Sequence, residues 1–108
     1  MADCARYLNG CGIGARYDGT YPNSTFIGSC PDKTGSAAYF SDDYKTALGK
    51  FWEAQTLAYD SEASYGWIQW PWKTEQGTGE GWTYKSGLEY GWIPKPVTNR
   101  EHPNICGA

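Results

Sequence analysis

Carboxylates and cysteines are the side chains of this chain that could take part in covalent chemistry. The chain has twelve Asp and Glu residues and four cysteines, but only one histidine, His102. Two carboxylates could act as general acid and base, yet each acidic residue also fits an ordinary role as a cap, a loop residue or a solvated charge. Cys11 and His102 could form a thiol nucleophile and its base, but no local signature of such enzymes surrounds them. The residues themselves therefore do not predict a catalytic site.

The four cysteines are Cys4, Cys11, Cys30 and Cys106, and they include no CxxC pair. With a single histidine to complete a ligand set, they do not predict a zinc site, and we expect no metal or cofactor. Residues 11–40 are dense in Gly, Pro, Asn, Ser and Asp, which is typical of a long loop. Because unsupported loops of about 30 residues are uncommon in compact domains, we expect a disulfide between Cys4 and Cys30 to pin this loop.

Aromatic side chains are the residues best suited to binding a ligand without covalent chemistry. They make up 17% of the chain, with six Trp and nine Tyr. The segment Tyr65–Trp72 (YGWIQWPW) is especially rich in them. Large amphipathic rings suit hydrophobic cores, protein interfaces and sugar-binding platforms alike. Composition alone does not choose among these three roles.

Charge and hydropathy exclude two classes of partner. Nine Lys and Arg against twelve Asp and Glu give a net charge of -3, with no basic run to neutralise phosphates, so we expect no nucleic-acid partner. No stretch approaches the roughly 18 to 20 consecutive apolar residues of a membrane span, so we expect no membrane insertion. The sequon Asn23-Ser24-Thr25 makes Asn23 a candidate glycan acceptor. Together with the cysteines, it favours a secretory origin.

The strongest secondary-structure signal predicts a helix over residues 41–60. Ser41 offers an N-cap, two aspartates follow at the positive end of the helix dipole, and apolar residues recur at helical spacing. This apolar stripe consists of Tyr44, Leu48, Phe51, Trp52 and Tyr59.

Shorter elements surround that helix. Residues 3–10 predict a short helix, and Trp82–Glu89 predicts another that Gly91 stops, whereas the prolines that follow forbid a continuous helix. Tyr65–Trp72 predicts a single strand that ends near Pro71. Because a lone strand leaves its backbone groups unpaired at both edges, we expect its sheet to be completed by rearrangement of the chain or by dimerisation.

Four blocks of the sequence resemble fungal family 5 exo-β-1,3-glucanases, in the same order and spacing. They are DCARYLNGCGIGARYDGTYPNSTFIGSC at 3–30, FWEAQTLAYD at 51–60, GWIQWPWKTE at 66–75 and GWIPKPVTNREHPNICG at 91–107. That family folds as a (β/α)8 barrel, which needs about 250 residues or more. The resemblance implies that residues 1–108 form a single small α/β domain, a fragment equivalent to the C-terminal quarter of the barrel. It would hold the last strand, helices, long disulfide-pinned loops and an incomplete sheet.

The resemblance carries over sugar contacts but no catalytic residue. Both catalytic glutamates of the family lie upstream of the first block, and hydrolysis needs both, so the chain is expected not to be an enzyme. Trp70 matches the tryptophan that stacks on the sugar ring at the cleavage subsite. Trp70 and Trp72 are therefore the candidates for a vestigial carbohydrate-binding site.

The resemblance also bears on the cysteines. Cys4 and Cys30 match positions expected to be bonded in the family, whereas the usual partner of Cys106 lies upstream of the resembling blocks. Cys106 could instead pair with Cys11, or either could form an intermolecular link or stay a free thiol.

From these observations we predict a non-catalytic, secreted fungal protein of the extracellular space or cell wall. It would derive from an exo-β-1,3-glucanase C-terminus and act through its surface, as an immunomodulatory or defensive protein that meets a cell-surface receptor. The alternatives are a weak β-glucan-binding module and an inactive truncation product of a glycoside hydrolase. A homodimer is also expected, because the aromatic segment Tyr65–Trp72 would pair with a second copy.

Overall fold

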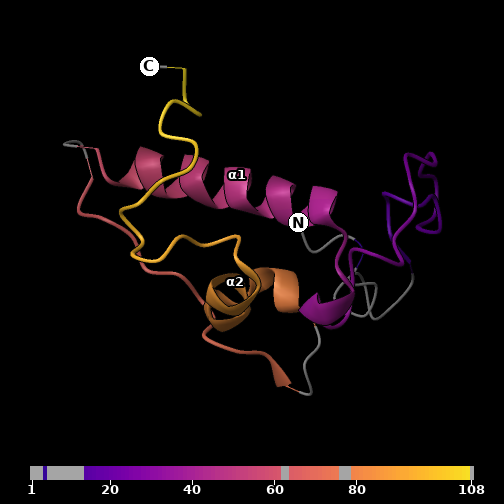
Figure 1. The fold of residues 1–108 in the computed structure, drawn as a ribbon. Helices are drawn as coiled ribbons and strands as arrows, with labels where there is room; N and C mark the ends of the chain where they lie inside the picture. Colours follow the sequence, from indigo (N-terminus) through magenta and orange to yellow (C-terminus); the bar gives the residue numbers. More distant parts are fainter. Residues whose placement is uncertain (1–3, 5–13, 62–63, 76–78, 108) are drawn as a thin grey trace.

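The computed structural model describes residue 4 and residues 14–61, 64–75 and 79–107. Within these residues the secondary structure is entirely helical, in the order η2 (Ala37–Tyr39), α1 (Asp42–Tyr59), η4 (Glu80–Trp82) and α2 (Tyr84–Tyr90). The two η elements are single turns of 3-10 helix. Figure 1 shows α1 crossing the molecule, with α2 below it. Beyond the first turn of α1 lies a loop-rich N-terminal lobe, the described residues up to 36.

Helix α1 forms where its capping signals predict it. The Ser41 side chain accepts a hydrogen bond from the backbone N–H of Tyr44 at 3.2 Å, which satisfies one of the free donors at the helix start. Asp42 and Asp43 occupy the first turn, where the helix dipole favours negative charge. The helix predicted over residues 41–60 is confirmed.

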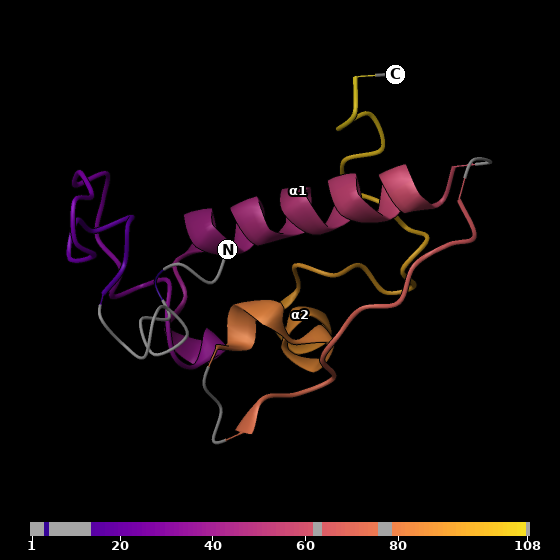
Figure 2. The same cartoon turned by 180° about the vertical axis from the view of Figure 1, so that it is seen from behind.

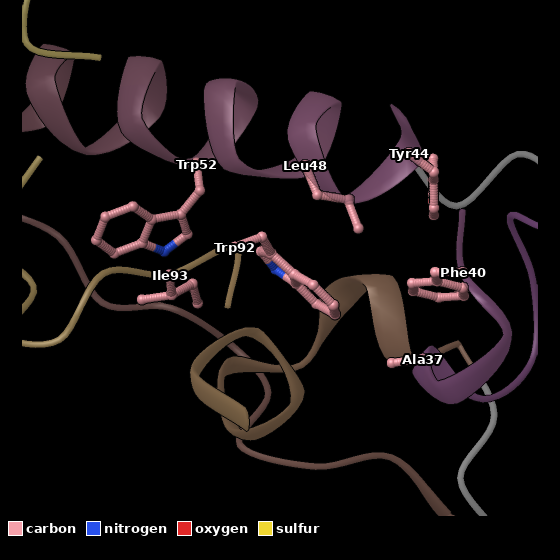
Figure 3. Packing of buried hydrophobic residues seen from close by; sticks show 7 residues of the cluster. All are labelled: Ala37, Phe40, Tyr44, Leu48, Trp52, Trp92 and Ile93. Carbon is pink, nitrogen blue, oxygen red and sulfur yellow. The ribbon is translucent and has the colours of Figure 1, made fainter. Parts of the chain in front are cut away.

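One face of α1 contributes Tyr44, Leu48 and Trp52 to the hydrophobic core, which Figure 3 shows from close by. Seven buried side chains form this core: Ala37, Phe40, Tyr44, Leu48, Trp52, Trp92 and Ile93. The rings of Phe40 and Tyr44 meet edge to face at 4.9 Å. Phe51 and Tyr59, which belong to the predicted apolar stripe, are instead half exposed, because they lie to one side of the buried face.

Helix α2 is short and is fixed at both ends. Thr83 caps its start by accepting from the N–H of Ser86, and Gly91 ends it in the left-handed conformation with φ of 90°. The predicted helix with its glycine stop is therefore confirmed. Gly87 lies so close to Ile93 that an added Cβ would be 2.3 Å from the Ile93 Cδ1 atom. The absence of a side chain at Gly87 lets the chain fold back across the helix.

The segment predicted as a strand, Tyr65–Trp72, runs extended but forms no strand in the part of the chain that the structure describes. Its last carbonyls bond to the start of α2 instead: Pro71 O accepts from the N–H of Tyr84 and Trp72 O from that of Lys85, both at 3.1 Å. These contacts satisfy helix donors rather than a sheet. Figure 2 shows the segment passing beside α2 on its way back from the end of α1. The barrel-fragment fold itself stays a prediction.

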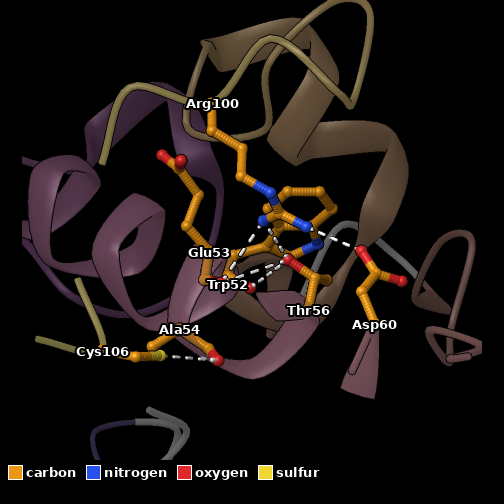
Figure 4. A network of polar contacts seen from close by, with 7 residues as sticks. All are labelled: Trp52, Glu53, Ala54, Thr56, Asp60, Arg100 and Cys106. Carbon is orange, nitrogen blue, oxygen red and sulfur yellow. Dashed lines mark hydrogen bonds and ion pairs between the residues drawn. The ribbon is translucent and has the colours of Figure 1, made fainter. Parts of the chain in front are cut away.

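The segment after α2 turns back onto α1 and is held there by polar contacts, which Figure 4 shows. The Arg100 guanidinium donates to Thr56 Oγ1 at 2.7 Å and pairs with the Asp60 carboxylate at 2.8 Å. Two residues later, the backbone N–H of His102 donates to the carboxylate of Glu53 at 2.9 Å. The side chain of Glu53 is buried, so this bond satisfies a charged group that would otherwise be costly in the interior.

The N-terminal lobe is closed by a disulfide between Cys4 and Cys30, whose Cα atoms are 5.3 Å apart. The predicted pairing of these two cysteines is confirmed. Ala15 and the ring of Tyr17 pack against the disulfide and form a second, smaller core. Cys106 carries an exposed free thiol, and Cys11 lies outside the described residues, as does the predicted helix over 3–10. Of the alternatives predicted for Cys106, the structure shows the free thiol and not a disulfide.

Candidate aromatic binding groove

A cavity of about 320 Å³ lies between α1 and the extended segment Tyr65–Trp72, and we call it the aromatic groove. Its described lining comes from α1, from the extended segment, from η4 and from the start of the C-terminal segment. Seven of the lining residues are aromatic: Phe51, Trp52, Tyr59, Trp67, Trp70, Trp82 and Trp92. The groove is therefore a concave, largely apolar surface of the kind that binds small ligands.

The walls of this groove are exposed although they are apolar. Trp70 is 84% exposed and Ile68 is 98% exposed, and Phe51 and Tyr59 stand half exposed on the opposite wall. Large exposed apolar patches on soluble proteins usually mark a binding surface. Trp52 forms the floor, because it is buried and its ring meets that of Trp67 edge to face at 5.4 Å.

Gln69 joins the two walls of the groove. Its Oε1 atom accepts from the indole Nε1–H of Trp52 at 2.7 Å, and its Nε2 atom donates to the Trp82 carbonyl at 3.2 Å. One side chain thus ties the extended segment both to α1 and to η4. Since Trp70 is the next residue, we expect Gln69 to fix the position of the Trp70 ring at the rim.

We expect Gln69→Leu to lower the free energy of unfolding by about 1 to 3 kcal/mol, because it leaves the Trp52 indole N–H without its acceptor in a largely buried position. Urea unfolding followed by tryptophan fluorescence measures the change. Gln55→Leu is the matched control, because Gln55 is an exposed glutamine of the same groove. Equal effects of the two substitutions would contradict the bridging role of Gln69.

The structure separates the two tryptophans predicted to bind carbohydrate. Trp70 lines the aromatic groove, whereas Trp72 packs its ring on Tyr84, with centroids 6.0 Å apart, and does not line it. Phe51, Tyr59 and Trp82 join Trp70 instead, and sequence reasoning assigned none of these three to binding. The spacing of Phe51, Gln55 and Tyr59 places them along one strip of α1, and this was the available signal.

The chemistry available in the groove is that of stacking and neutral hydrogen bonds. Its described lining contains no Asp, Glu, Lys, Arg or His, and its polar groups are those of Gln55, Thr56, Tyr59, Gln69 and the indoles. Indole and phenol rings can pack on the C–H faces of a sugar, while the amides can bond to its hydroxyls. Among the described residues no group of three or more His, Cys, Asp or Glu could hold a metal ion.

Tyr44 and Asp32, the two groups whose pKa is shifted, lie outside the groove. Burial raises the pKa of Tyr44 to about 12, with a smaller contribution from the negative charge of Asp32. Hydrogen bonds from Lys33 and then Ser41 lower the pKa of Asp32, so that this carboxylate stays ionised. None of the described helices is long and apolar enough to cross a membrane.

Known relatives of the chain are fungal glycosidases. It is 46% identical over 107 residues to the probable glucan 1,3-beta-glucosidase A of Emericella nidulans, a match that takes in 98% of the chain. It is 43% identical over 112 residues to a glucan 1,3-beta-glucosidase of Kluyveromyces lactis and 40% identical over 107 residues to that of Candida oleophila. No family model matches the chain.

The chain is therefore homologous, along nearly its whole length, to a C-terminal-type segment of fungal glucan 1,3-beta-glucosidases. The resemblance found in the sequence is confirmed. The chain spans only about a quarter of the length of these relatives, 25% for the Emericella protein and 24% for the Candida protein. The homology thus concerns a part of those enzymes.

Proposed function

We propose that this chain binds β-1,3-glucan in the aromatic groove and does not hydrolyse it by itself. The observation that carries the proposal is the exposed Trp70 ring on a concave aromatic surface whose described lining contains no Asp, Glu, Lys, Arg or His. The relatives are named for action on glucan, which supports a β-glucan as the ligand. The flat apolar rings and neutral amides suit an uncharged polysaccharide.

Binding without hydrolysis follows from the side chains that the groove offers. A retaining glycosidase places two carboxyl groups about 5 to 5.5 Å apart, one as nucleophile and one as acid and base. The described groove presents aromatic and amide side chains instead. In this proposal the chain supplies sugar contacts, and any catalysis by a longer protein would come from carboxylates outside these 108 residues.

We expect Trp70→Ala to weaken the affinity for laminari-oligosaccharides by about two- to tenfold, since one aromatic stacking contact is worth about 0.5 to 1.5 kcal/mol. Isothermal titration calorimetry with laminarihexaose measures the change. Tyr39→Ala is the matched control, because Tyr39 is 77% exposed but does not line the groove. The same samples should release no glucose from laminarin between about pH 4 and 7. Unchanged affinity after Trp70→Ala would overturn the proposal.

Secretion is part of this proposal. The Cys4–Cys30 disulfide supports it, because such bonds form and persist in oxidising compartments. An immunomodulatory or defensive activity through a cell-surface receptor stays a prediction from the sequence. No specific set of described residues favours it, and glucan binding is preferred for that reason.

Self-association remains a proposal that involves the same surface. Trp70, Ile68 and Tyr65 project apolar groups into solvent along one extended segment, and a second copy could cover them. A homodimer through this face would occupy the aromatic groove. Sedimentation of the chain at micromolar concentration tests it, and addition of laminarihexaose should then shift the equilibrium toward monomer because the two occupants compete.

A further inference from the structure

We propose that Asn23 is a site of N-linked glycosylation and that the N-terminal lobe is built to display the oligosaccharide. Asn23 opens the sequon Asn23-Ser24-Thr25, which has no proline at its middle position. A sequon acts in this way only on a chain that enters the secretory route and only where the fold leaves room for a bulky polar substituent. The inference rests on the secretion included in the proposed function and is independent of glucan binding.

The conformation of the sequon supplies the first structural argument. Asn23 has φ of 62°, in the left-handed region that asparagine tolerates better than most residues. The backbone N–H of Ser24 donates to the Tyr21 carbonyl at 3.1 Å, which closes a tight turn around Asn23. Both Asn23 and Thr25 are exposed. The turn therefore presents the acceptor amide and the threonine of the sequon at the surface.

The position of the turn supplies the second argument. Figures 1 and 2 show the lobe projecting beyond the first turn of α1, away from α2 and the C-terminal segment. No residue of the sequon lines the aromatic groove or belongs to either buried core. Phe26 and Ile27, which follow the sequon directly, are 65% and 71% exposed. An oligosaccharide on Asn23 would lie beside these apolar side chains and shield them from other molecules.

The disulfide supplies a third argument, because it closes the lobe that carries the sequon. The Cys4–Cys30 bond needs an oxidising compartment, and oligosaccharide transfer occurs along the same secretory route. In the transfer, the Asn23 side-chain nitrogen forms a bond to the anomeric carbon of a lipid-diphosphate-linked oligosaccharide. The bond from that carbon to the phosphate oxygen breaks, the amide loses one proton, and the lipid diphosphate leaves. No oxidant or reductant is required.

The test is to secrete the full chain from a fungal host behind a cleavable leader and to measure its intact mass before and after peptide N-glycosidase treatment. We expect a glycosylated product whose extra mass the enzyme removes, converting Asn23 to Asp. Asn23→Gln and Thr25→Val should each abolish the extra mass. Thr25→Ser, which keeps the sequon, should retain it. Asn99→Gln is the control for an exposed asparagine in a turn that lacks the sequon, and it should change nothing.

Secreted wild-type chain with the Cys4–Cys30 bond in place but with bare Asn23 would overturn the inference, because the bond shows that the chain had folded in an oxidising compartment. An extra mass that persists in Asn23→Gln would overturn it as well. Affinity for laminarihexaose is measured on the same material after deglycosylation. A bare Asn23 with intact glucan binding, or a glycosylated chain without it, separates the failure of this inference from that of the proposed function.

Discussion

Replacement of Trp92 by alanine should lower the free energy of unfolding by about 3 to 5 kcal/mol, the usual cost of removing a large buried aromatic side chain. Trp92 lies at the centre of the core, where its ring is 5.8 Å from that of Phe40 and its backbone packs against Gly49 of α1. Small domains are stable by only about 5 to 15 kcal/mol. The variant should therefore unfold at a much lower urea concentration, which circular dichroism measures.

Trp70→Ala is the control for this substitution, because it removes the same side chain from a position that is 84% exposed. Its free energy of unfolding should stay within about 0.5 kcal/mol of the wild type. The two tryptophans would then divide their roles, Trp92 for stability and Trp70 for binding. A small effect of Trp92→Ala would mean that the core shown in Figure 3 does not hold the helices together.

Loss of the Cys4–Cys30 disulfide should cost about 3 to 4 kcal/mol, the chain-entropy value for the closed loop. The two cysteines are 26 residues apart in sequence, and the lobe that they close has only a small core of its own. We expect Cys30→Ser, or reduction by dithiothreitol, to lower the free energy of unfolding measured by urea titration by that amount. The lobe should also become the part of the chain most open to proteolysis.

Cys106→Ser is the matched control, since the thiol of Cys106 is exposed and free. Reduction of this variant should have the same effect as reduction of the wild type, and the substitution alone should change stability little. If Cys30→Ser is as stable as the wild type, the disulfide contributes nothing to the native state and the small core around Ala15 is sufficient.

The helices could be predicted from the sequence because their signals are local. Ser41 caps α1 and Gly91 ends α2, and each works through backbone groups within a few residues. The disulfide could also be predicted, since a long loop rich in Gly and Pro needs a constraint. The resemblance to a glycosidase was already strong in the sequence, where whole blocks of residues match.

The strand and the groove could not be predicted in the same way, because both depend on contacts between distant residues. An aromatic, β-branched segment favours a strand only where a neighbouring strand is available to pair with it. In this chain the carbonyls of Pro71 and Trp72 find the free donors of α2 instead. The groove likewise depends on the bond between Gln69 and Trp52, which no periodicity in the sequence reveals.

The hydrogen bonds between the extended segment Tyr65–Trp72 and the first turn of α2 couple opening of the aromatic groove to exposure of two α2 amides. Trp70 cannot move far from the groove while the carbonyl of the next residue, Pro71, accepts a hydrogen bond from the backbone N–H of Tyr84. Separation of the segment would expose the amides of Tyr84 and Lys85 to water, and the rate at which these two protons exchange would then report how often the groove opens. A ligand that keeps the groove closed would slow hydrogen exchange at both amides by the same factor, even though it contacts neither of them.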